Sequence, residues 1–233
     1  MNTIYQQAFA NRGSKRPCSA WLQLIVFLFC LVVVVVSPAG LDFSSELIAK
    51  VEMKYGKHAS NRVLAWQGLI QSAKNLPEKE KLERVNDFFN QQLEFVDDDE
   101  LWGLVDYWAT PLEALSKGAG DCEDYSIAKY FTLIELGVPD SKMRITYVKA
   151  IELDQAHMVL TYFEKPGSIP AVLDNLKPAI SPASMRRDLL PVYSFNGSGL
   201  WLAKSRGTGK KLGGSDRLNK WGGLKSRMRV NKF

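Results

Sequence analysis

The chain has 233 residues and a formal net charge of +5, from 30 Lys/Arg and 25 Asp/Glu. The positive charge lies at the two ends: residues 1–39 hold three basic and no acidic residues, and residues 200–233 hold ten basic residues and one acid. Residues 40–199 therefore carry 17 basic and 24 acidic residues, a net charge of −7, which excludes a basic, nucleic-acid-binding domain. The 194 residues after residue 39 are enough for one domain with a hydrophobic core.

The N-terminal segment, residues 1–39, has the composition of an export signal. Three basic residues precede the apolar run Trp21–Val36, and small residues follow it up to Ala39. This order is typical of a signal peptide cleaved after Ala39, and the run is short for a membrane span, which needs about 20 apolar residues. An uncleaved signal anchor, which would tether the domain to the inner membrane, is the alternative. Both place the remainder outside the cytoplasm, in the periplasm of a Gram-negative cell, and argue against nucleic acid as a partner.

Helical spacing of apolar residues follows from residue 44 to about residue 93. It predicts helices over Ser44–Lys57 and Asn61–Lys74, and a third that begins near Pro77 and ends near Leu93. The acidic run Asp97–Glu100 is expected to be a loop. Three aromatic residues after it are expected either in the core or on a binding surface: Trp102, Tyr107 and Trp108.

Two further helices are expected on either side of a glycine-rich turn at residues 118–120. The stretch Thr110–Glu113 is a capping box with proline at the first helical position, and it predicts a short helix that ends at Gly118. Asp121 is a good N-cap for a helix over Cys122–Leu136, which Gly137 and the proline after it terminate.

The pattern then changes to strands, at Met143–Ala150, His157–Phe163, Ala171–Asp174 and near Leu190–Phe195. Helices first and strands second predict an α+β domain over residues 40–202, with N-terminal helices packed on an antiparallel sheet. Residues 203–233 are basic and rich in glycine, and we expect a disordered tail. Such a tail can contact lipid headgroups or nucleic acid, but a solvated tail without a function is the simpler expectation, and export argues against nucleic acid.

Cys122 is the only cysteine of the expected mature domain, because Cys18 and Cys30 lie in or beside the signal segment. It has no partner for a disulfide although an exported protein would favour one, which suggests a chemical role. At the first turn of its helix, free N–H groups and the helix dipole favour a thiolate and can bind an oxyanion. The neighbouring acids oppose that thiolate, so we expect a metal ion or an imidazolium to neutralise them.

A thiol nucleophile needs a base, and the chain offers two histidines, His58 and His157. His58 lies in a polar helical region and is expected at the surface, whereas His157 begins an apolar strand. If residues 163 and 168 pair around a four-residue loop, Asp174 lies opposite His157 on the same face, with Cβ atoms roughly 4.5–5.5 Å apart. That carboxylate would orient the imidazole toward Cys122. A shift of the register by two residues would separate the pair.

The acids beside the cysteine are Asp121, Glu123 and Asp124, with further acids upstream at 97–99 and 106. Their hard carboxylate oxygens suit calcium, which takes six to eight oxygen ligands, whereas zinc is not expected. An N-cap at Asp121, followed by acids that interact favourably with the helix dipole, explains the same residues without a metal. Composition alone leaves the two interpretations open.

Four stretches together resemble the bacterial transglutaminase-like cysteine proteinases: Asp106–Pro111, Gly120–Tyr125, Ala156–Leu160 and Leu173–Leu176. The likeness covers roughly Phe95–Leu202. It implies a papain/transglutaminase-like fold with the nucleophile at a helix N-terminus. It further implies that Cys122 is the nucleophile, His157 the general base and Asp174 its orienting acid. By the same resemblance, three acids are the calcium ligands: Asp121, Glu123 and Asp124.

The resemblance also carries expectations about function. It implies a calcium-dependent periplasmic endopeptidase that cuts a large, repeat-containing surface adhesin near its N-terminus, at a double-alanine site. Release of the adhesin would promote biofilm dispersal. The expected inhibitory partner is the periplasmic domain of an inner-membrane receptor for cyclic di-GMP. The basic tail has no counterpart in this resemblance.

Two alternatives use the same residues differently. Another exported thiol enzyme, such as a peptidoglycan amidase or a transglutaminase, could use the same triad. A binding module could keep the fold and lack the chemistry. The intact set of Cys122, His157 and Asp174 favours an enzyme.

Overall fold

The computed structural model describes residues 43–202 and 209–231. The expected signal segment, residues 1–39, lies outside the described residues. Among the helices of the described part, none combines the length and the apolar character that a membrane crossing requires.

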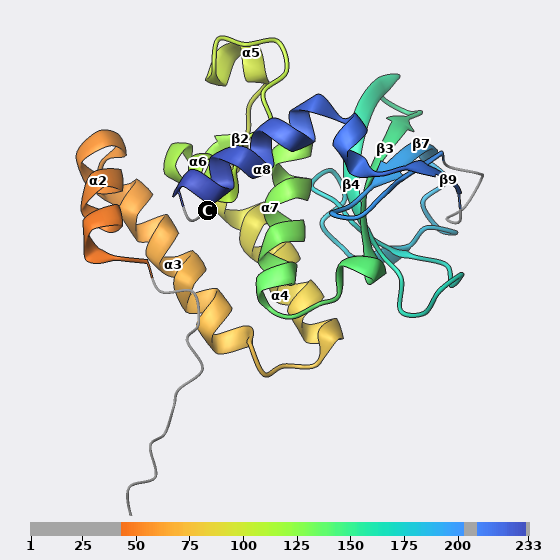
Figure 1. Cartoon of the computed structure of the whole chain (residues 1–233), viewed down its shortest axis with the longest axis horizontal. Coiled ribbons are helices and arrows are strands. Elements are labelled where there is room, and N and C mark those ends of the chain that lie inside the picture. The colour runs from red at the N-terminus through yellow and green to blue at the C-terminus, as the bar shows by residue number, and fades with distance from the viewer. Residues whose placement is uncertain (1–42, 203–208, 232–233) are drawn as a thin grey trace, which may run out of the picture. The chain divides into compact units, whose positions relative to one another are not determined.

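Helices come first and a sheet second, as the sequence predicts for an α+β domain (Figure 1). Most predicted boundaries are correct to within a few residues, although residues 98–101 form a short helix where a loop was expected. The α-helices before the sheet are α2 (Ser45–Tyr55), α3 (Lys57–Ala73), α4 (Glu78–Gln92), α5 (Asp98–Leu101), α6 (Pro111–Lys117) and α7 (Cys122–Glu135).

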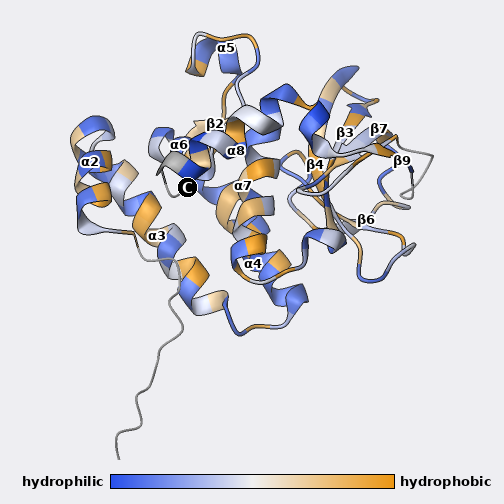
Figure 2. Cartoon of the chain, in the orientation of Figure 1, coloured by the Kyte–Doolittle hydropathy of each residue, from blue (hydrophilic) through white to orange (hydrophobic). Residues whose placement is uncertain are grey.

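Helix α7 lies at the centre of the helical part and packs on the sheet. Most of its residues are buried, although apolar and polar residues alternate along it (Figure 2), and they contact α4, α6 and the first long strands of the sheet. The indole of Trp66 on α3 donates a hydrogen bond of 2.8 Å to the Thr132 hydroxyl of α7. Burial on several sides fixes α7, and with it the position of its first residue, Cys122.

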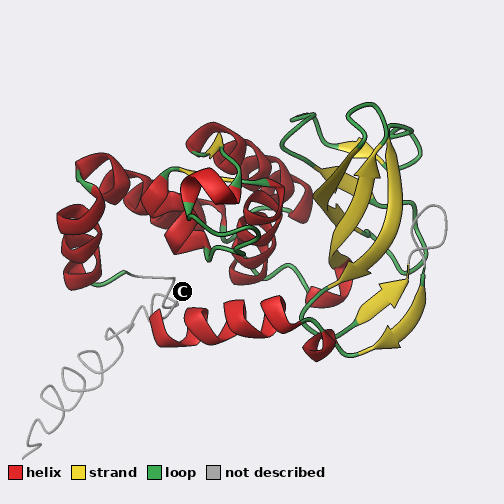
Figure 3. Cartoon of the chain, turned by 90° about the horizontal axis from the view of Figure 1, so that it is seen from above, coloured by secondary structure: helices red, strands yellow, loops and turns green. Residues whose placement is uncertain are grey.

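The strands of the main sheet are antiparallel, in the order β6-β5-β4-β3-β7-β8-β9, and the sheet lies beside the helices (Figure 3). The hairpin of β3 and β4 is its longest pairing, from Met143 opposite Tyr162 to Ala150 opposite Gln155. The bounds are β3 (Met143–Ala150), β4 (Gln155–Tyr162), β5 (Ala171–Leu173), β6 (Ser181–Pro182), β7 (Leu189–Phe195), β8 (Leu200–Leu202) and β9 (Lys210–Gly213).

The register between β4 and β5 differs from the predicted one by two residues. Leu160 lies opposite Leu173 and Tyr162 opposite Ala171, because the connection occupies residues 163–170 and is longer than the four-residue loop that we assumed. A shift by two keeps side chains on the same face of the sheet. Asp174, just beyond the end of β5, therefore becomes a diagonal neighbour of His157, and long side chains can still meet across that diagonal.

The prediction of a disordered tail over residues 203–233 is wrong for its described part. Strand β9 pairs with β8, and a short 3-10 helix (Ser215–Arg217) leads into α8 (Asn219–Asn231). Trp221 and Leu224 on α8 are fully buried, and Trp221 stacks on Phe131 of α7 at 5.2 Å. Trp221, Leu224 and Met228 of α8 pack against the hydrophobic core, and α8 runs back from the sheet toward the helices (Figure 3). The domain thus extends beyond residue 202.

Candidate active site

Cys122 is the first residue of α7, and it is a free cysteine. The capping residue Asp121 has extended backbone, as an N-cap does, but its side chain makes no capping hydrogen bond. The thiol donates a hydrogen bond of 3.0 Å to Oε2 of Glu123. The nucleophile predicted from sequence therefore lies at a helix N-terminus, where backbone N–H groups are free to bind an oxyanion.

His157 on β4 and Asp174 after β5 are in direct contact. Nε2 of His157 lies 2.7 Å from Oδ1 of Asp174, and both side chains are buried. The predicted pair forms although the predicted register was wrong, because the diagonal separation is within reach of the two side chains. The hydrogen bond fixes the orientation of the imidazole ring.

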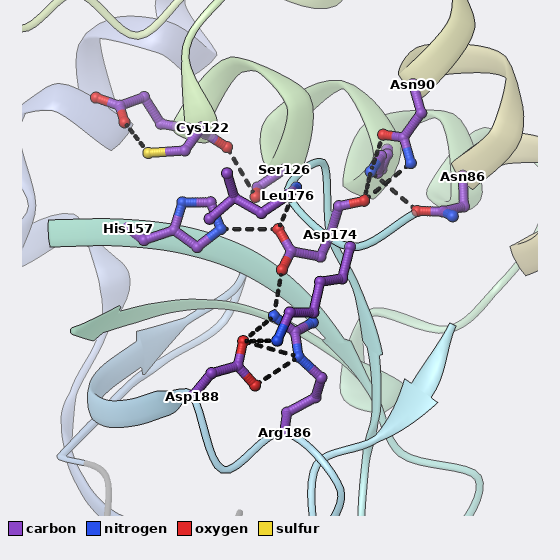
Figure 4. Close-up of polar contacts among 12 residues, drawn as sticks. Asn86, Asn90, Cys122, Ser126, His157, Asp174, Leu176, Arg186 and Asp188 are labelled. Atoms are coloured by element: carbon purple, nitrogen blue, oxygen red, sulfur yellow. Dashed lines mark hydrogen bonds and ion pairs between the residues drawn. The ribbon is translucent and has the colours of Figure 1, made fainter. Parts of the chain in front are cut away.

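The second ring nitrogen of His157, Nδ1, lies on the side of Cys122 (Figure 4). Both residues line one cleft of about 680 Å³, whereas Asp174 lies behind the imidazole. The other histidine, His58, lies on α3, far along the chain, and is not among the residues that line the cleft. The arrangement thus has a thiol, an imidazole that can take its proton, and a carboxylate that orients the imidazole.

The electrostatics around Cys122 disfavour the thiolate. Burial raises the pKa of the Cys122 thiol well above its usual value, and the carboxylates of Glu123 and Asp121 raise it further. A hydrogen bond from the backbone N–H of Met158 acts in the opposite direction. Neutralisation of the nearby carboxylates would make the thiolate easier to form.

The carboxylates beside Cys122 form a cluster that is buried at Asp98 and Asp124 and exposed at Asp106. Ligand atoms of Asp98, Asp121 and Asp124 lie within 4.8 Å of one another, and so do those of Asp98, Asp106 and Glu123. One side-chain oxygen each of Asp98, Asp121 and Asp124 is buried without a hydrogen-bond partner. Burial and then the charges of Glu123, Asp124 and Asp98 raise the pKa of Asp121 to about 9.

This cluster fits a calcium ion. Several buried carboxylate oxygens without donors repel one another unless a cation or protons are present, and burial raises the pKa of Asp98 and Asp124 as well. Hard oxygen ligands are the donor set that calcium prefers. Asp121, Glu123 and Asp124, the ligands expected from the resemblance, lie in this cluster.

Asp98 and Asp106 lie in the cluster in addition to the three expected ligands. A parallel pairing of β1 (Glu94–Phe95) with β2 (Ala119–Gly120) places the segment before α5 next to the residue that caps α7. Helix α5 then directs Asp98 inward, where its Oδ2 accepts a hydrogen bond from the backbone of Tyr107. The acidic run was visible in the sequence, but only this long-range pairing shows which of its members is buried.

The C-terminal segment forms one wall of the cleft. Residues 217–220 line it, and the ammonium of Lys220 forms an ion pair with Asp106. Farther along α8, the guanidinium of Arg227 donates to the backbone carbonyl of Trp108. No periodic pattern in residues 203–233 is strong enough to predict these contacts.

The aromatic residues near the site belong mainly to the core. Trp108 is buried and stacks on Phe195 with ring centroids 5.4 Å apart, although it also borders the cleft. Trp102 and Tyr107 are partly buried and pack against the same core. At the cleft, by contrast, exposed apolar side chains are available to a ligand: Phe95, Val105, Leu153 and Leu176.

Comparison with known proteins identifies the family and the fold. The sequence model of the bacterial transglutaminase-like cysteine proteinases matches residues 58–187. LapG of Legionella pneumophila, in an EGTA-treated structure, is 47% identical, with a TM-score of 0.69 over 82% of this chain and 100% of that chain. A calcium-bound structure of the same protein is 47% identical, with a TM-score of 0.68 over 80% of this chain and 99% of that chain. A search of curated proteins gives no match.

Proposed function

The chain belongs to the bacterial transglutaminase-like cysteine proteinases, and on that premise we propose that it is a calcium-dependent, LapG-like endopeptidase acting through Cys122, His157 and Asp174. One observation carries the assignment of roles. The imidazole of His157 is bonded through Nε2 to Asp174 and directs its other nitrogen toward Cys122, at the N-terminus of α7 (Figure 4). This is the arrangement that a thiol nucleophile, a base and an orienting acid require.

In the proposed mechanism, His157 removes the proton from Cys122 through Nδ1, and the thiolate attacks the scissile carbonyl. Backbone N–H groups at the start of α7 bind the oxyanion. The imidazolium returns its proton to the leaving amine as the C–N bond breaks, which leaves a thioester on Cys122. Water, deprotonated by His157, then attacks the thioester and releases the acid and the free thiol. Asp174 stabilises the imidazolium during both steps.

The residues that would hold calcium are Asp98, Asp106, Asp121, Glu123 and Asp124. When bound, calcium would supply positive charge that offsets these carboxylates and would fix the loop before α7. The support is the set of buried oxygens without partners, together with the calcium-bound and EGTA-treated states of LapG.

The proposed substrate is a large, repeat-containing surface adhesin, cut near its N-terminus at a double-alanine site, with biofilm dispersal as the result. The proposed location is the periplasm, and the proposed inhibitor is the periplasmic domain of an inner-membrane cyclic di-GMP receptor. The resemblance of the sequence motifs supports these proposals. The cleft of about 680 Å³, with exposed apolar side chains along it, is large enough to take a peptide segment.

The test is cleavage of an adhesin N-terminal fragment that contains a double-alanine site, by the full chain with calcium or with a chelator. Cleavage in calcium that is lost with chelator, and lost in Cys122→Ala and Cys122→Ser, is the expected result. A fragment with the two alanines replaced by valine is the matched control. Cleavage that persists in Cys122→Ala would remove the nucleophile assignment. Incorporation of an amine, or release of peptidoglycan stem peptides, without cleavage of the fragment would favour a transglutaminase or an amidase.

A further inference from the structure

Asp174 uses both of its carboxylate oxygens. Oδ1 lies 2.7 Å from Nε2 of His157 and accepts a second bond of 3.1 Å from the backbone of Leu176. Oδ2 accepts a bond of 2.7 Å from Nη2 of Arg186. Only 1% of Asp174 is exposed, so water does not replace these partners.

Arg186 is buried between two carboxylates, with 6% of its surface exposed. Beside its bond to Asp174, its Nε and Nη2 atoms donate to Asp188 at 3.1 and 2.8 Å. Lys177 pairs with the outer side of Asp188 at 3.0 Å. Ion pairs therefore connect five residues in a line that runs outward from the imidazole: His157, Asp174, Arg186, Asp188 and Lys177. Figure 4 shows the line from His157 to Asp188.

The ammonium of Lys129, on α7, approaches Asp174 from the other side. It donates to the backbone carbonyl of Asp174 at 3.1 Å and to the side chains of Asn86 and Asn90. It therefore holds the main chain of Asp174, whereas Arg186 is the cation that holds the carboxylate. Loss of Arg186 would leave Oδ2 buried without a donor, and the carboxylate would then turn or take up a proton.

We propose that Arg186 is a positioning residue for catalysis: it keeps Asp174 ionised and turned so that Oδ1 faces His157. The inference rests on the proposed function, because it gives Arg186 a role in the proposed triad. It is consistent with the electrostatics. Burial raises the pKa of Asp174, but its hydrogen bonds and charge interactions with His157 and Arg186 outweigh burial and leave that pKa below its usual value.

Two substitutions separate positioning from a structural role. Arg186→Gln removes the ion pair between Arg186 and Asp188, and Asp188→Asn removes its negative charge and one of its two acceptor oxygens. Only Arg186→Gln also removes the donor of the bond to Asp174. Arg187→Gln is the matched control, because Arg187 is the next residue and is exposed. Arg186→Lys tests partial rescue, since an ammonium replaces the charge without the planar fork.

The first measurement is the far-downfield proton signal of a histidine N–H bonded to a carboxylate, in the full chain with calcium. The chain has two histidines, so His58→Gln assigns the signal to His157. We expect the signal to be lost in Arg186→Gln and retained in Asp188→Asn and Arg187→Gln. Retention of the signal in folded Arg186→Gln would overturn the proposal.

The second measurement is the rate of Cys122 modification by iodoacetamide across pH, with peptide mapping to separate Cys122 from Cys18 and Cys30. We expect Arg186→Gln to react at least about 10-fold more slowly, the loss that a small misplacement of a catalytic group produces. The pKa of Asp174 rises without Arg186, so the acid limb of the profile should move to higher pH. Asp188→Asn should stay within about threefold of the wild type, without that movement.

Equal losses in Arg186→Gln and Asp188→Asn would mean that Arg186 acts only through its pair with Asp188, and would overturn the proposal. If Arg186→Gln does not fold, Arg186→Lys takes its place, and equal losses of Cys122 reactivity in Arg186→Lys and Asp188→Asn would likewise overturn the proposal. The proposed thiol-protease function and the proposed role of Arg186 can fail independently. An unreactive Cys122 in the wild type removes the thiol-protease function, whereas the proton signal still tests whether Arg186 holds Asp174 against His157.

Discussion

At the scale of single residues, the carboxylates around Cys122 require a compensating charge. Asp98, Asp121 and Asp124 each have a buried oxygen without a donor, and burial raises the pKa of all three. Protons can supply the compensation when no cation is bound, whereas a divalent cation supplies it and leaves the oxygens free to act as ligands. The resemblance does not include Asp98 among its calcium ligands, yet only 3% of it is exposed and it joins two groups of the cluster.

Asp98→Asn should weaken calcium binding and, at the same time, stabilise the calcium-free protein. The amide keeps the shape of the side chain but removes one of several like charges, so repulsion falls while the cation loses a ligand charge. Isothermal titration with calcium and thermal unfolding in EGTA measure the two effects. The matched control is Asp99→Asn, one residue along the same helix, because the Asp99 side chain is exposed. Equal calcium affinities in the two variants would exclude Asp98 as a ligand.

Residues whose role depends on local sequence could be predicted, and those that depend on distant partners could not. Cys122 and the acids beside it share one helix start, which sequence spacing shows directly. Asp98 and Arg186 reach the site through β1–β2 pairing and the turn before β7, and neither contact leaves a periodic signal. His157 and Asp174 are an intermediate case: they meet as predicted, but by a different register.

At the scale of secondary-structure elements, α8 completes the core although its sequence is mostly basic. Leu224 is fully buried, whereas Leu212 on β9 is 41% exposed. Leu224→Ala should lower the free energy of unfolding by about 2–5 kcal/mol, the usual result for a buried leucine. Leu212→Ala, the same change at an exposed position, should cost less than about 1 kcal/mol. Urea unfolding measures both. Two small, similar values would indicate that the C-terminal segment does not pack on the domain.

Strand β2 brings its backbone very close to the metal cluster at Gly120. A Cβ atom there would lie 2.7 Å from Oδ2 of Asp124, and the strand pairing leaves the backbone little freedom to move away. Gly120→Ala should therefore displace Asp124 and reduce calcium affinity. Gly68→Ala is the control, because nothing lies within 4 Å of its Cβ position on α3, and it should stabilise that helix by about 1 kcal/mol. Calcium titration of both variants measures the effect. Unchanged calcium affinity in Gly120→Ala would mean that calcium binding does not depend on the position of the Asp124 side chain.

Elements with their own capping or turn signals were predicted with nearly correct bounds. The capping box at Thr110–Glu113 forms in full, with bonds of 3.2 and 2.8 Å, and α6 ends at Gly118 in the left-handed conformation. The β4–β5 register and the pairing of β9 depend on loop length and on burial against residues far along the chain. Local sequence does not contain that information.

At the scale of the whole molecule, calcium binding should be coupled to folding through the same carboxylates. Folding brings them together and raises their pKa values, to about 9 for Asp121, whereas an unfolded aspartate titrates near its usual value of about 4. Between these pH values the calcium-free folded chain binds more protons than the unfolded chain. Its stability therefore falls as pH rises from about 4 toward 9. Calcium binds the deprotonated carboxylates and should oppose this loss.

The difference in melting temperature between calcium and EGTA should thus increase as pH rises from 5 to 9, a window chosen from these pKa values. Lys129, whose pKa burial lowers to about 7, adds a contribution in which stability rises with pH above 7. That contribution is present with and without calcium, so it cancels in the difference between the two curves. Magnesium at the same concentration controls for ionic strength, since its strict octahedral geometry suits this cluster less well. If the difference in melting temperature between calcium and EGTA is the same at every pH, then calcium does not stabilise the fold by binding to these carboxylates.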